Sequence, residues 1–463
     1  MNDDKKINAH NPKVCIVGLG PAGIGAALTF SKHNLASNVL CLDAGPPPNS
    51  RSCLILQKGY CKKDNPCQMI SGFGGCSLIG GGKISLLPAG KTLTTILGSE
   101  NFANKKLSEA FTLFSNYLPL QKPNITLNNI NQEKEFFEKL GFQYKYYDAY
   151  IFDQIELRKA YQKILQELES AKIKCLLNTQ VEEITHSENG FKLIAKHKNR
   201  KITIFSEYLI LGMGRLGLNM LRSLNSKLNL CGEENHLDVG VRLEFPNDLY
   251  ENMNIYHNDL KLLFTDARTF CVCRNGKIAP YRFEDMFFTE GYYDSRYKSG
   301  FTNLGILVRL RPSKQNRTIF EEIKKRIYQI SNGELVYQRL SDYLDIPVVS
   351  GKPIEFLKTS ISFGIMDDVN QCFPSYISTK IKDAVFYFVD RLLPKNRLNE
   401  VTVFAPEVNY GGLSFPIKPD FSIIPKLYLI GDCTGKFRGI LQSFCSGIIC
   451  AESIIGDNNE KNQ

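Results

Sequence analysis

The stretch PKVCIVGLGPAGIGAALTF, residues 12–30, limits the possible fold more than any other part of this sequence. An apolar strand, Val14–Val17, runs into a glycine turn and then into a helix of small residues, expected from Ala22 to Lys32. The glycines of the turn follow the spacing G-x-G-x-x-G: Gly18, Gly20 and Gly23. This strand, turn and helix predict the start of a doubly wound α/β fold.

Each glycine has a separate task in a turn of this kind. Gly18 permits the tight turn, Gly20 lets the backbone approach a pyrophosphate, and Gly23 lets the helix pack against the strand. The helix then begins with Pro21 and Ala22, where free N–H groups and the positive end of the helix dipole favour phosphate.

An acid follows the turn in the expected register. Asp43 lies twenty residues after Gly23, on the predicted strand Asn38–Gly45, where a carboxylate can accept hydrogen bonds from ribose hydroxyls. Arg51 comes soon after and can either reach the pyrophosphate or serve as an ordinary loop arginine. The sequence therefore predicts dinucleotide binding; the alternative is a tight turn of another doubly wound protein.

The last part of the chain narrows the choice of dinucleotide. The segment KLYLIGDCTGKFRGILQSFCSGIICAESI, residues 426–454, places Gly431 and Asp432 directly after a buried strand. The order of a GxGPAG start, a middle strand followed by GxGR, and a late GD is similar to the two-dinucleotide-fold flavoproteins of the glutathione reductase type. That resemblance implies FAD, with Asp432 on its ribityl chain and Gly439 and Ile440 at the pyrimidine edge of the flavin.

Other segments resemble the bacterial FAD-dependent dehydrogenases. They are SGFGGCSLIGGGKI, DVGVRLEFP, TFCVCRNGKIAP and RGILQSFCSGI. With the glycine turn they extend the resemblance from residue 14 to residue 454. The sequence departs from the pattern at Cys76, where the family has Ala, and at Gly81, where it has Asp.

A second glycine motif, GMGRLG, contains Gly214. No second apolar strand ending on an acid follows it, so a separate NADPH-binding domain is not expected. The resemblance makes it the return of the chain to the FAD domain, and it puts Val181 on a strand that meets the adenine. NAD(P)H is expected, if at all, as a transient electron donor.

The expected fold class is α/β, a discontinuous Rossmann-like FAD-binding domain with an inserted α+β substrate domain. Five segments divide the chain: 12–100, 151–234 and 405–456 for the FAD-binding domain, 101–150 for a helical insertion, and 235–404 for the substrate or cap domain. Arg242 and Glu244 alternate on one strand of the cap domain, and an ion pair at the domain seam is expected there.

Cys76 and Lys83 are the candidate catalytic residues, because the loop that carries them is expected near the flavin. The alternative for Lys83 is a surface-loop lysine. The 14 cysteines include a C-x-C, Cys271 and Cys273, but no C-x-x-C pair, so no metal site is expected. A redox dithiol and ordinary buried thiols both stay open for these cysteines.

The net charge of +10 is concentrated in one part of the chain. Residues 255–330 hold 14 Lys and Arg against 8 Asp and Glu, a net charge of +6. A solvated basic face explains this, and so does an anionic substrate or partner. The arginines considered for an anionic substrate are Arg274, Arg282, Arg309 and Arg311.

These observations predict an FAD-dependent oxidoreductase that moves a hydride between the flavin and a small or medium organic substrate. An FAD-dependent tRNA-modifying enzyme and an assembly partner with structural FAD are the alternatives. The polar start MNDDKKINAHNP has no apolar signal region, and no apolar run reaches the ~18 residues of a membrane span. We therefore expect a cytoplasmic protein without a membrane partner. The oligomeric state does not follow from the sequence.

Overall fold

The central strand of the first sheet is β2 (Val14–Val17), all four residues of which are buried. The computed structural model describes residues 9–78, 80, 82–293, 298–347 and 357–460. In this sheet the order is β25-β26-β11-β2-β3-β7, and all neighbours are parallel except β25 and β26. The other strands of the sheet are β3 (Val39–Leu42), β7 (Lys174–Leu176), β11 (Tyr208–Leu211), β25 (Ser422–Ile424) and β26 (Leu427–Leu429). The parallel strands and their helices make this the predicted Rossmann-like unit.

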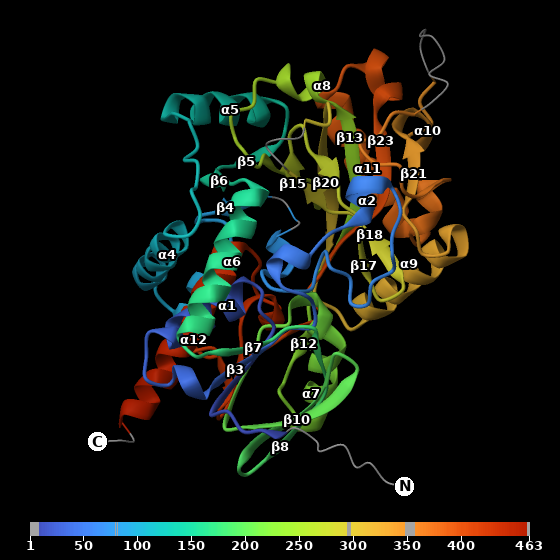
Figure 1. Cartoon of the computed structure of the whole chain (residues 1–463). Helices are drawn as coiled ribbons and strands as arrows, with labels where there is room; N and C mark the ends of the chain where they lie inside the picture. The colour runs from blue at the N-terminus through green and yellow to red at the C-terminus, as the bar shows by residue number, and fades with distance from the viewer. Residues whose placement is uncertain (1–8, 79, 81, 294–297, 348–356, 461–463) are drawn as a thin grey trace.

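Two helices from opposite ends of the described chain cover one face of this sheet together. Helix α1 (Pro21–Ser31) packs against α12 (Ile440–Glu460), and the two lie side by side in the lower part of Figure 1. By length and composition, residues 440–457 of α12 could cross a membrane, but 72% of that window is buried inside the protein. A core helix of this kind passes the same test, so the finding says little about a membrane.

A second, larger sheet forms the upper half of the molecule in Figure 1. Its order is β22-β21-β23-β13-β20-β15-β14-β5. The strands are β5 (Gln143–Lys145), β13 (Leu237–Pro246), β14 (Lys261–Phe264), β15 (Ala267–Cys273), β20 (Phe301–Leu310), β21 (Val336–Arg339), β22 (Ile365–Met366) and β23 (Thr402–Tyr410). At its centre, β13 pairs antiparallel with β20 and β23, and residues 237–245 are all buried.

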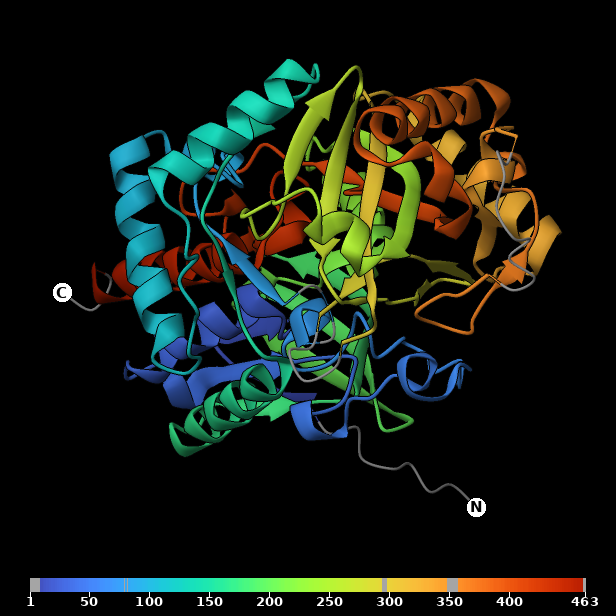
Figure 2. The ribbon, with the colours of Figure 1, turned by 90° about the horizontal axis from the view of Figure 1, so that it is seen from above.

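Helices flank this sheet on both sides. Seen from above, α4 and α5 lie on one side of the yellow-green strands, and α9 and α11 on the other (Figure 2). Longer helices of the described chain are α4 (Glu100–Ser115), α5 (Leu127–Lys139), α6 (Gln154–Ser170), α7 (Leu218–Leu228), α9 (Gln315–Ser331) and α11 (Ser375–Leu392). Shorter ones are α2 (Leu54–Lys58), α3 (Thr92–Leu97), α8 (Asn247–Glu251) and α10 (Leu340–Tyr343).

A hairpin excursion of three strands, β8 to β10, separates β7 from β11. Together with β1, from the start of the described chain, it forms a four-stranded sheet of order β1-β10-β9-β8. Its strands are β1 (Ala9–His10), β8 (Thr179–Ser187), β9 (Gly190–His197) and β10 (Arg200–Ser206). Small strand pairs complete the architecture: β4 (Lys83–Ser85) with β6 (Ala149–Ile151), β12 (Glu233–Glu234) with β24 (Leu413–Ser414), β16 (Lys277–Ile278) with β19 (Gly291–Tyr292), and β17 (Tyr281–Phe283) with β18 (Met286–Phe288).

Two predicted segment boundaries differ from the strands. The boundary at residue 404 falls inside β23, whose pairing with β13 continues to Tyr410. The segment 101–150 is not only helical, because β5 adds an edge strand to the larger sheet by pairing with β14. The larger sheet therefore includes strands from outside the predicted segment 235–404, and sequence composition does not mark where these strands begin and end.

The ion pair expected between Arg242 and Glu244 is not formed. Arg242 instead binds Glu407 on the neighbouring strand β23, while both oxygens of the Glu244 carboxylate accept hydrogen bonds from Ser360. Both side chains are buried, so each needs a partner at contact distance, and each has found one on a different neighbouring segment. Burial raises the pKa of Glu244 to about 7, although Ser360 and Arg242 oppose that shift.

This shift predicts a pH-dependent stability. Folded Glu244 keeps its proton up to about pH 7, whereas unfolded glutamate loses it near pH 4.5, so stability falls as pH rises between these values. From pH 4.5 to 7.5 the unfolding free energy of the wild type should fall by about 2–3 kcal/mol relative to Glu244→Gln, measured by urea unfolding. The exposed Glu183→Gln is the control. Parallel pH profiles of wild type and Glu244→Gln would contradict the assignment.

Candidate functional site

The glycine turn is built by close backbone contacts. Gly18 has φ +97°, and a Cβ there would lie 2.4 Å from the carbonyl oxygen of Gly212. A Cβ on Gly23 would lie 1.9 Å from the oxygen of Gly18. Neither position accepts a side chain, since atoms this close must move apart.

Gly20 differs, because space surrounds it. A Cβ at Gly20 would meet only the Cα of Gly75, at an ordinary 3.8 Å. It stands directly before α1, whose N-terminus has Pro21 in its first turn and no side-chain cap among the described residues. Uncapped N–H groups and the helix dipole at an open glycine form a surface suited to phosphate.

Asp43 holds the glycine turn through hydrogen bonds to backbone N–H groups. One carboxylate oxygen accepts the N–H of Leu19 at 2.7 Å, and the other accepts those of Gly45 and Gly72 at 2.9 and 2.8 Å. Burial raises the pKa of Asp43, and these donors oppose the shift. The carboxylate thus fixes two loops. Oδ1 already accepts two hydrogen bonds, whereas Oδ2 accepts one and has lone-pair capacity left.

Arg51 is fully buried and binds backbone carbonyls. Its guanidinium donates to Gln68 and Phe73, which holds the loop that approaches the glycine turn. Burial lowers the pKa of Arg51 to about 10, so the group stays cationic at neutral pH. Most of its donors are used in the loop, so the contribution left for a pyrophosphate is mainly its charge.

The late acidic motif reaches the same end of the sheet. Gly431 and Asp432 follow β26, which lies next to β11 and one strand from β2. Asp432 accepts a hydrogen bond from the Nε of Arg438 at 2.9 Å. Gly439, at φ +123°, leads into α12, whose first residue is Ile440.

Two buried polar atoms at the start of α12 lack a hydrogen-bond partner among the described residues. They are Nη1 of Arg438 and Oε1 of Gln442. The amide nitrogen of Gln442 is satisfied by the carbonyls of Ser85 and Ala89. Because buried polar groups are nearly always paired, a donor and an acceptor left open here mark a place for a polar ligand.

Charged side chains lie near Cys76. Arg215, Glu290 and Asp432 are near enough to Cys76 to affect its ionisation. The residue is exposed, although many protein atoms lie around its thiol. Loss of solvation by the surrounding protein raises the pKa of the Cys76 thiol, and the positive charge of Arg215 opposes this shift. Arg215 donates to the hydroxyl of Tyr281 and covers its ring, with 4.9 Å from guanidinium to centroid. Local sequence pattern offers no signal for Glu290, and Arg215 lies in the discounted second glycine motif.

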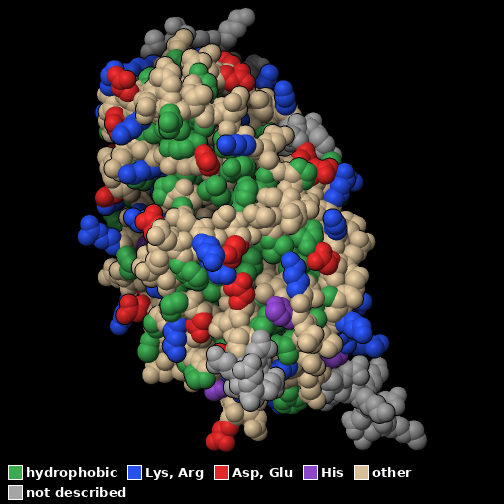
Figure 3. All heavy atoms as spheres, turned by 90° about the vertical axis from the view of Figure 1, so that its left-hand side faces the viewer, with side chains coloured by type: hydrophobic (Ala, Val, Ile, Leu, Met, Phe, Trp, Pro, Cys, Tyr) green, Lys and Arg blue, Asp and Glu red, His purple; other side chains and the backbone are tan. Residues whose placement is uncertain are grey.

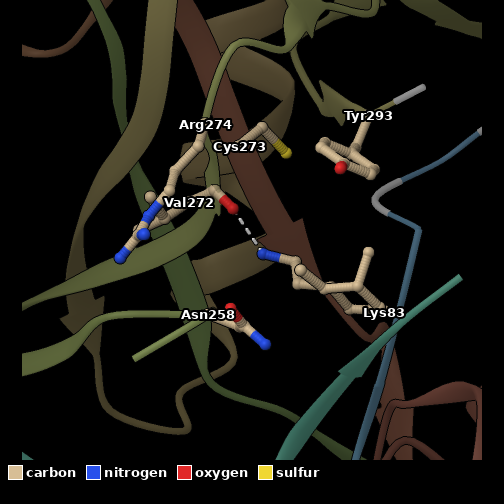
Figure 4. Close-up of a pocket in the computed structure, with 7 residues that line it drawn as sticks. Lys83, Asn258, Val272, Cys273, Arg274 and Tyr293 are labelled. Atoms are coloured by element: carbon tan, nitrogen blue, oxygen red, sulfur yellow. Dashed lines mark hydrogen bonds between the residues drawn. The ribbon is translucent and has the colours of Figure 1, made fainter. Parts of the chain in front are cut away.

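Lys83 occupies a buried ion pair. Its ammonium lies 2.7 Å from Asp259 Oδ1 and also donates to the carbonyl of Val272. Although burial lowers the pKa of Lys83, Asp259 outweighs it and raises that pKa, so the group is cationic at neutral pH. Figure 4 shows Lys83 pointing toward Val272 at a small pocket that Asn258 and Tyr293 also line. The predicted catalytic role has no support in these contacts, which instead join the loop to the cap domain. Gly81, in the same loop, lies outside the described residues.

The four arginines considered for an anionic substrate do not come together. Arg274 lines the pocket of Lys83 and donates to backbone carbonyls of residues 255 and 257. Arg282 binds carbonyls of residues 63 and 64, Arg309 binds Asp238, and Arg311 is exposed. Three of these side chains bind separate partners and the fourth is exposed, so these four arginines do not form one cationic site.

The second glycine motif belongs to the first sheet. Gly214 follows β11, which pairs with β2 and β26, and no atom lies within 4 Å of a Cβ placed there. Val181 lies half-buried on β8 at a bulge against β9. The motif therefore does not start a separate dinucleotide domain in the described chain.

No protein-family model matches this chain, and no curated protein matches it. Among solved structures it is similar to quinol fumarate reductase FrdA of E. coli, with 11% identity over 96% of this chain and 70% of that one and a TM-score of 0.43. A geranylgeranyl bacteriochlorophyll reductase-like protein from Thermoplasma acidophilum has 12% identity over 97% and 80% of the chains and a TM-score of 0.39. p-Nitrophenol 4-monooxygenase PnpA from Pseudomonas putida has 10% identity over 98% of this chain and 82% of that one, with a TM-score of 0.38. Likeness this weak assigns no activity.

Arg242 and Glu407 form a buried charge pair, and the effect of breaking it on the unfolding free energy can be measured. Arg242 is fully buried and binds Glu407 through two hydrogen bonds of 2.8 Å. Glu407→Leu should lower the unfolding free energy by about 3 kcal/mol, because it leaves a buried cation without its main partner. Arg242→Met combined with Glu407→Leu should recover most of that loss in denaturant titrations.

The exposed pair Arg326–Glu322 is the control. Glu322→Ala should change stability by less than about 1 kcal/mol. A double variant no more stable than Glu407→Leu would show that the two side chains act separately.

Proposed function

We propose that this chain is an FAD-dependent oxidoreductase. The observation that carries the proposal is the open position at Gly20, before an uncapped helix N-terminus, together with Arg438 Nη1 and Gln442 Oε1 at the start of α12, which have no partner among the described residues. The first place suits a pyrophosphate and the second suits a polar ring edge, and FAD has both groups.

The residues fit this cofactor in the order that the sequence predicts. The pyrophosphate would lie at Gly20, Pro21 and Ala22, and Asp432 would meet the ribityl chain. The start of α12, at Gly439 and Ile440, would meet the pyrimidine edge, where a positive helix end favours negative charge. Bound there, the flavin would supply hydride transfer through its N5 atom.

The chain's own contribution to catalysis lies around Cys76. This thiol would line the flavin site, the carboxylate of Glu290 would take or give a proton, and the Arg215–Tyr281 pair would orient the substrate. Arg215 and Arg438 are positive, and Glu290 and Asp432 are negative, so these four side chains are balanced in charge. That balance favours a small or medium organic substrate without a strong requirement for negative charge.

Partner classes other than small molecules have less support. On the face shown in Figure 3, Lys and Arg side chains are scattered among acidic ones and form no continuous basic area. A tRNA-modifying function needs such an area, since phosphate contacts dominate RNA affinity. NAD(P)H is proposed only as a transient electron donor.

The first experiment is to purify the protein, record its visible spectrum, and identify the released cofactor by chromatography. FAD is the expected cofactor. Anaerobic titration with NADH and NADPH then tests the electron donor. Colourless protein that takes up no added FAD would end the proposal, and FMN in place of FAD would remove the argument from the glycine turn.

Gly20→Ala is expected to reduce FAD occupancy at least tenfold without loss of stability. The added methyl group has room in the protein, but it stands where the pyrophosphate must approach. Flavin per chain and the thermal midpoint are the two measurements. Gly456→Ala, at another open glycine, is the control and should keep both values. Full FAD occupancy in Gly20→Ala would place the cofactor elsewhere.

Asp432→Ala should weaken FAD retention more than any single Cys→Ala substitution. Asp432 is assigned to the ribityl chain, whereas half of the cysteines are buried and only Cys76 and Cys231 are exposed. Flavin content per chain after gel filtration compares the variants. Equal occupancy in Asp432→Ala and wild type would exclude Asp432 as a ligand.

A further inference from the structure

The C-x-C of β15 does not have regular strand geometry. Cys271 has φ +45°, in the left-handed region, and the pairing of β15 with β20 shifts register between Phe270 and Cys273. In a regular strand, residues two apart lie about 6–7 Å from each other on the same face. At this bulge the two thiols come into hydrogen-bond contact instead.

Buried charges hold this bulge in place. The carbonyl of Cys271 accepts a hydrogen bond from Arg242 at 3.0 Å. Between the cysteines, the N–H of Val272 donates to Asp259 at 3.1 Å, and its carbonyl accepts from Lys83 (Figure 4). The two members of the Lys83–Asp259 ion pair thus hydrogen-bond the carbonyl and the N–H of Val272, the residue between the two cysteines.

The same cations act on the thiols. The hydrogen bond from Cys271 lowers the pKa of Cys273 and raises that of Cys271. Burial opposes the first shift, while Lys83 and Arg242 reinforce it. Cys273 is therefore the thiol that ionises first, and thiolates are the attacking species in disulfide exchange.

We propose that Cys271 and Cys273 form a reversible disulfide, a modification site that reacts with low-molecular-weight disulfides of the glutathione type. Cys273 is buried and lines the small pocket beside Lys83, and Cys271 is half-buried. The site does not depend on the proposed cofactor.

The reaction balances as a dithiol–disulfide exchange. The Cys273 thiolate attacks one sulfur of oxidised glutathione, which forms a mixed disulfide and releases one glutathione thiolate. Cys271 then loses its proton and attacks the Cys273 sulfur, which closes the protein disulfide and releases the second glutathione. Two protein thiols are oxidised, and one external disulfide is reduced to two thiols.

The ring formed by this disulfide contains one intervening residue. Such a short ring strains the disulfide, and strained disulfides are reduced easily. The pair should therefore open and close with the glutathione ratio. The cross-strand pair Cys41–Cys175 offers a contrast, because these cysteines lie opposite each other in regular parallel strands of the first sheet. The hydrogen bond with Cys175, and then burial, raise the pKa of Cys41.

The sequence makes the test direct. Trypsin cleaves after Arg268 and Arg274, so the peptide TFCVCR carries both cysteines and no other. The full-length protein, with and without added FAD, is equilibrated with oxidised and reduced glutathione at varied ratios, blocked with N-ethylmaleimide, and digested. Mass spectrometry should find this peptide two hydrogens lighter and unlabelled under oxidising buffer, and carrying two labels after reduced glutathione.

Variants separate the steps. Cys271→Ser should accumulate the glutathione mixed disulfide on Cys273, whereas Cys273→Ser should react at least tenfold more slowly. Cys231→Ser, at an exposed cysteine, is the control and should behave as wild type. A doubly labelled peptide throughout the oxidising series overturns the proposal, and so does equal reactivity of the Cys271→Ser and Cys273→Ser proteins. Because the readout is a peptide mass, failure of FAD binding would leave this result unaffected.

Discussion

The backbone contact between α1 and α12 brings together the first and the last helix of the described chain. A Cβ on Gly25 would lie 2.2 Å from the oxygen of Phe444, and a Cβ on Gly447 would lie 1.9 Å from the oxygen of Ala22. Only glycines allow helices to approach this closely. The approach fixes the start of α12 beside the glycine turn, so Asp432 and Arg438 can serve the same ligand as Gly20.

A second set of contacts joins the two sheets. Lys83 of the loop after the glycine turn pairs with Asp259, and Arg215 of the second glycine motif binds Tyr281. Both links are buried or half-buried and cross between the first sheet and the inserted domain. The residues around Cys76 therefore lie at a seam whose geometry depends on charge pairs as well as on apolar packing.

Sequence patterns predicted the parts of this fold that depend on local periodicity. The strand Val14–Val17, the turn and α1 were expected from the apolar and small residues of this stretch. The order of the motifs likewise predicted the discontinuous first domain, apart from the course of β5 and β23.

Long-range partners could not be predicted in the same way. The spacing of Arg242 and Glu244 suggested a pair on one strand, but the partner of Arg242 comes from 165 positions later in the chain. Lys83 and the four arginines were judged by residue type, whereas their roles depend on which carbonyls and carboxylates lie nearby. The C-x-C spacing can be read from the sequence. Its bulge cannot, because Asp259 and Lys83, which hydrogen-bond the backbone there, belong to no local pattern with the cysteines.

The close contact of α1 with α12 also has a consequence for how the protein is made. A ribosome releases α1 and β2 early, yet the helix that covers them is among the last described segments to emerge. Until then an apolar helix surface stays uncovered, and exposed surface of this kind is prone to aggregation. Premature termination before Ile440 would leave all six strands of the first sheet present but the helix that covers them missing, so chaperone dependence should concentrate in the time before α12 is synthesised.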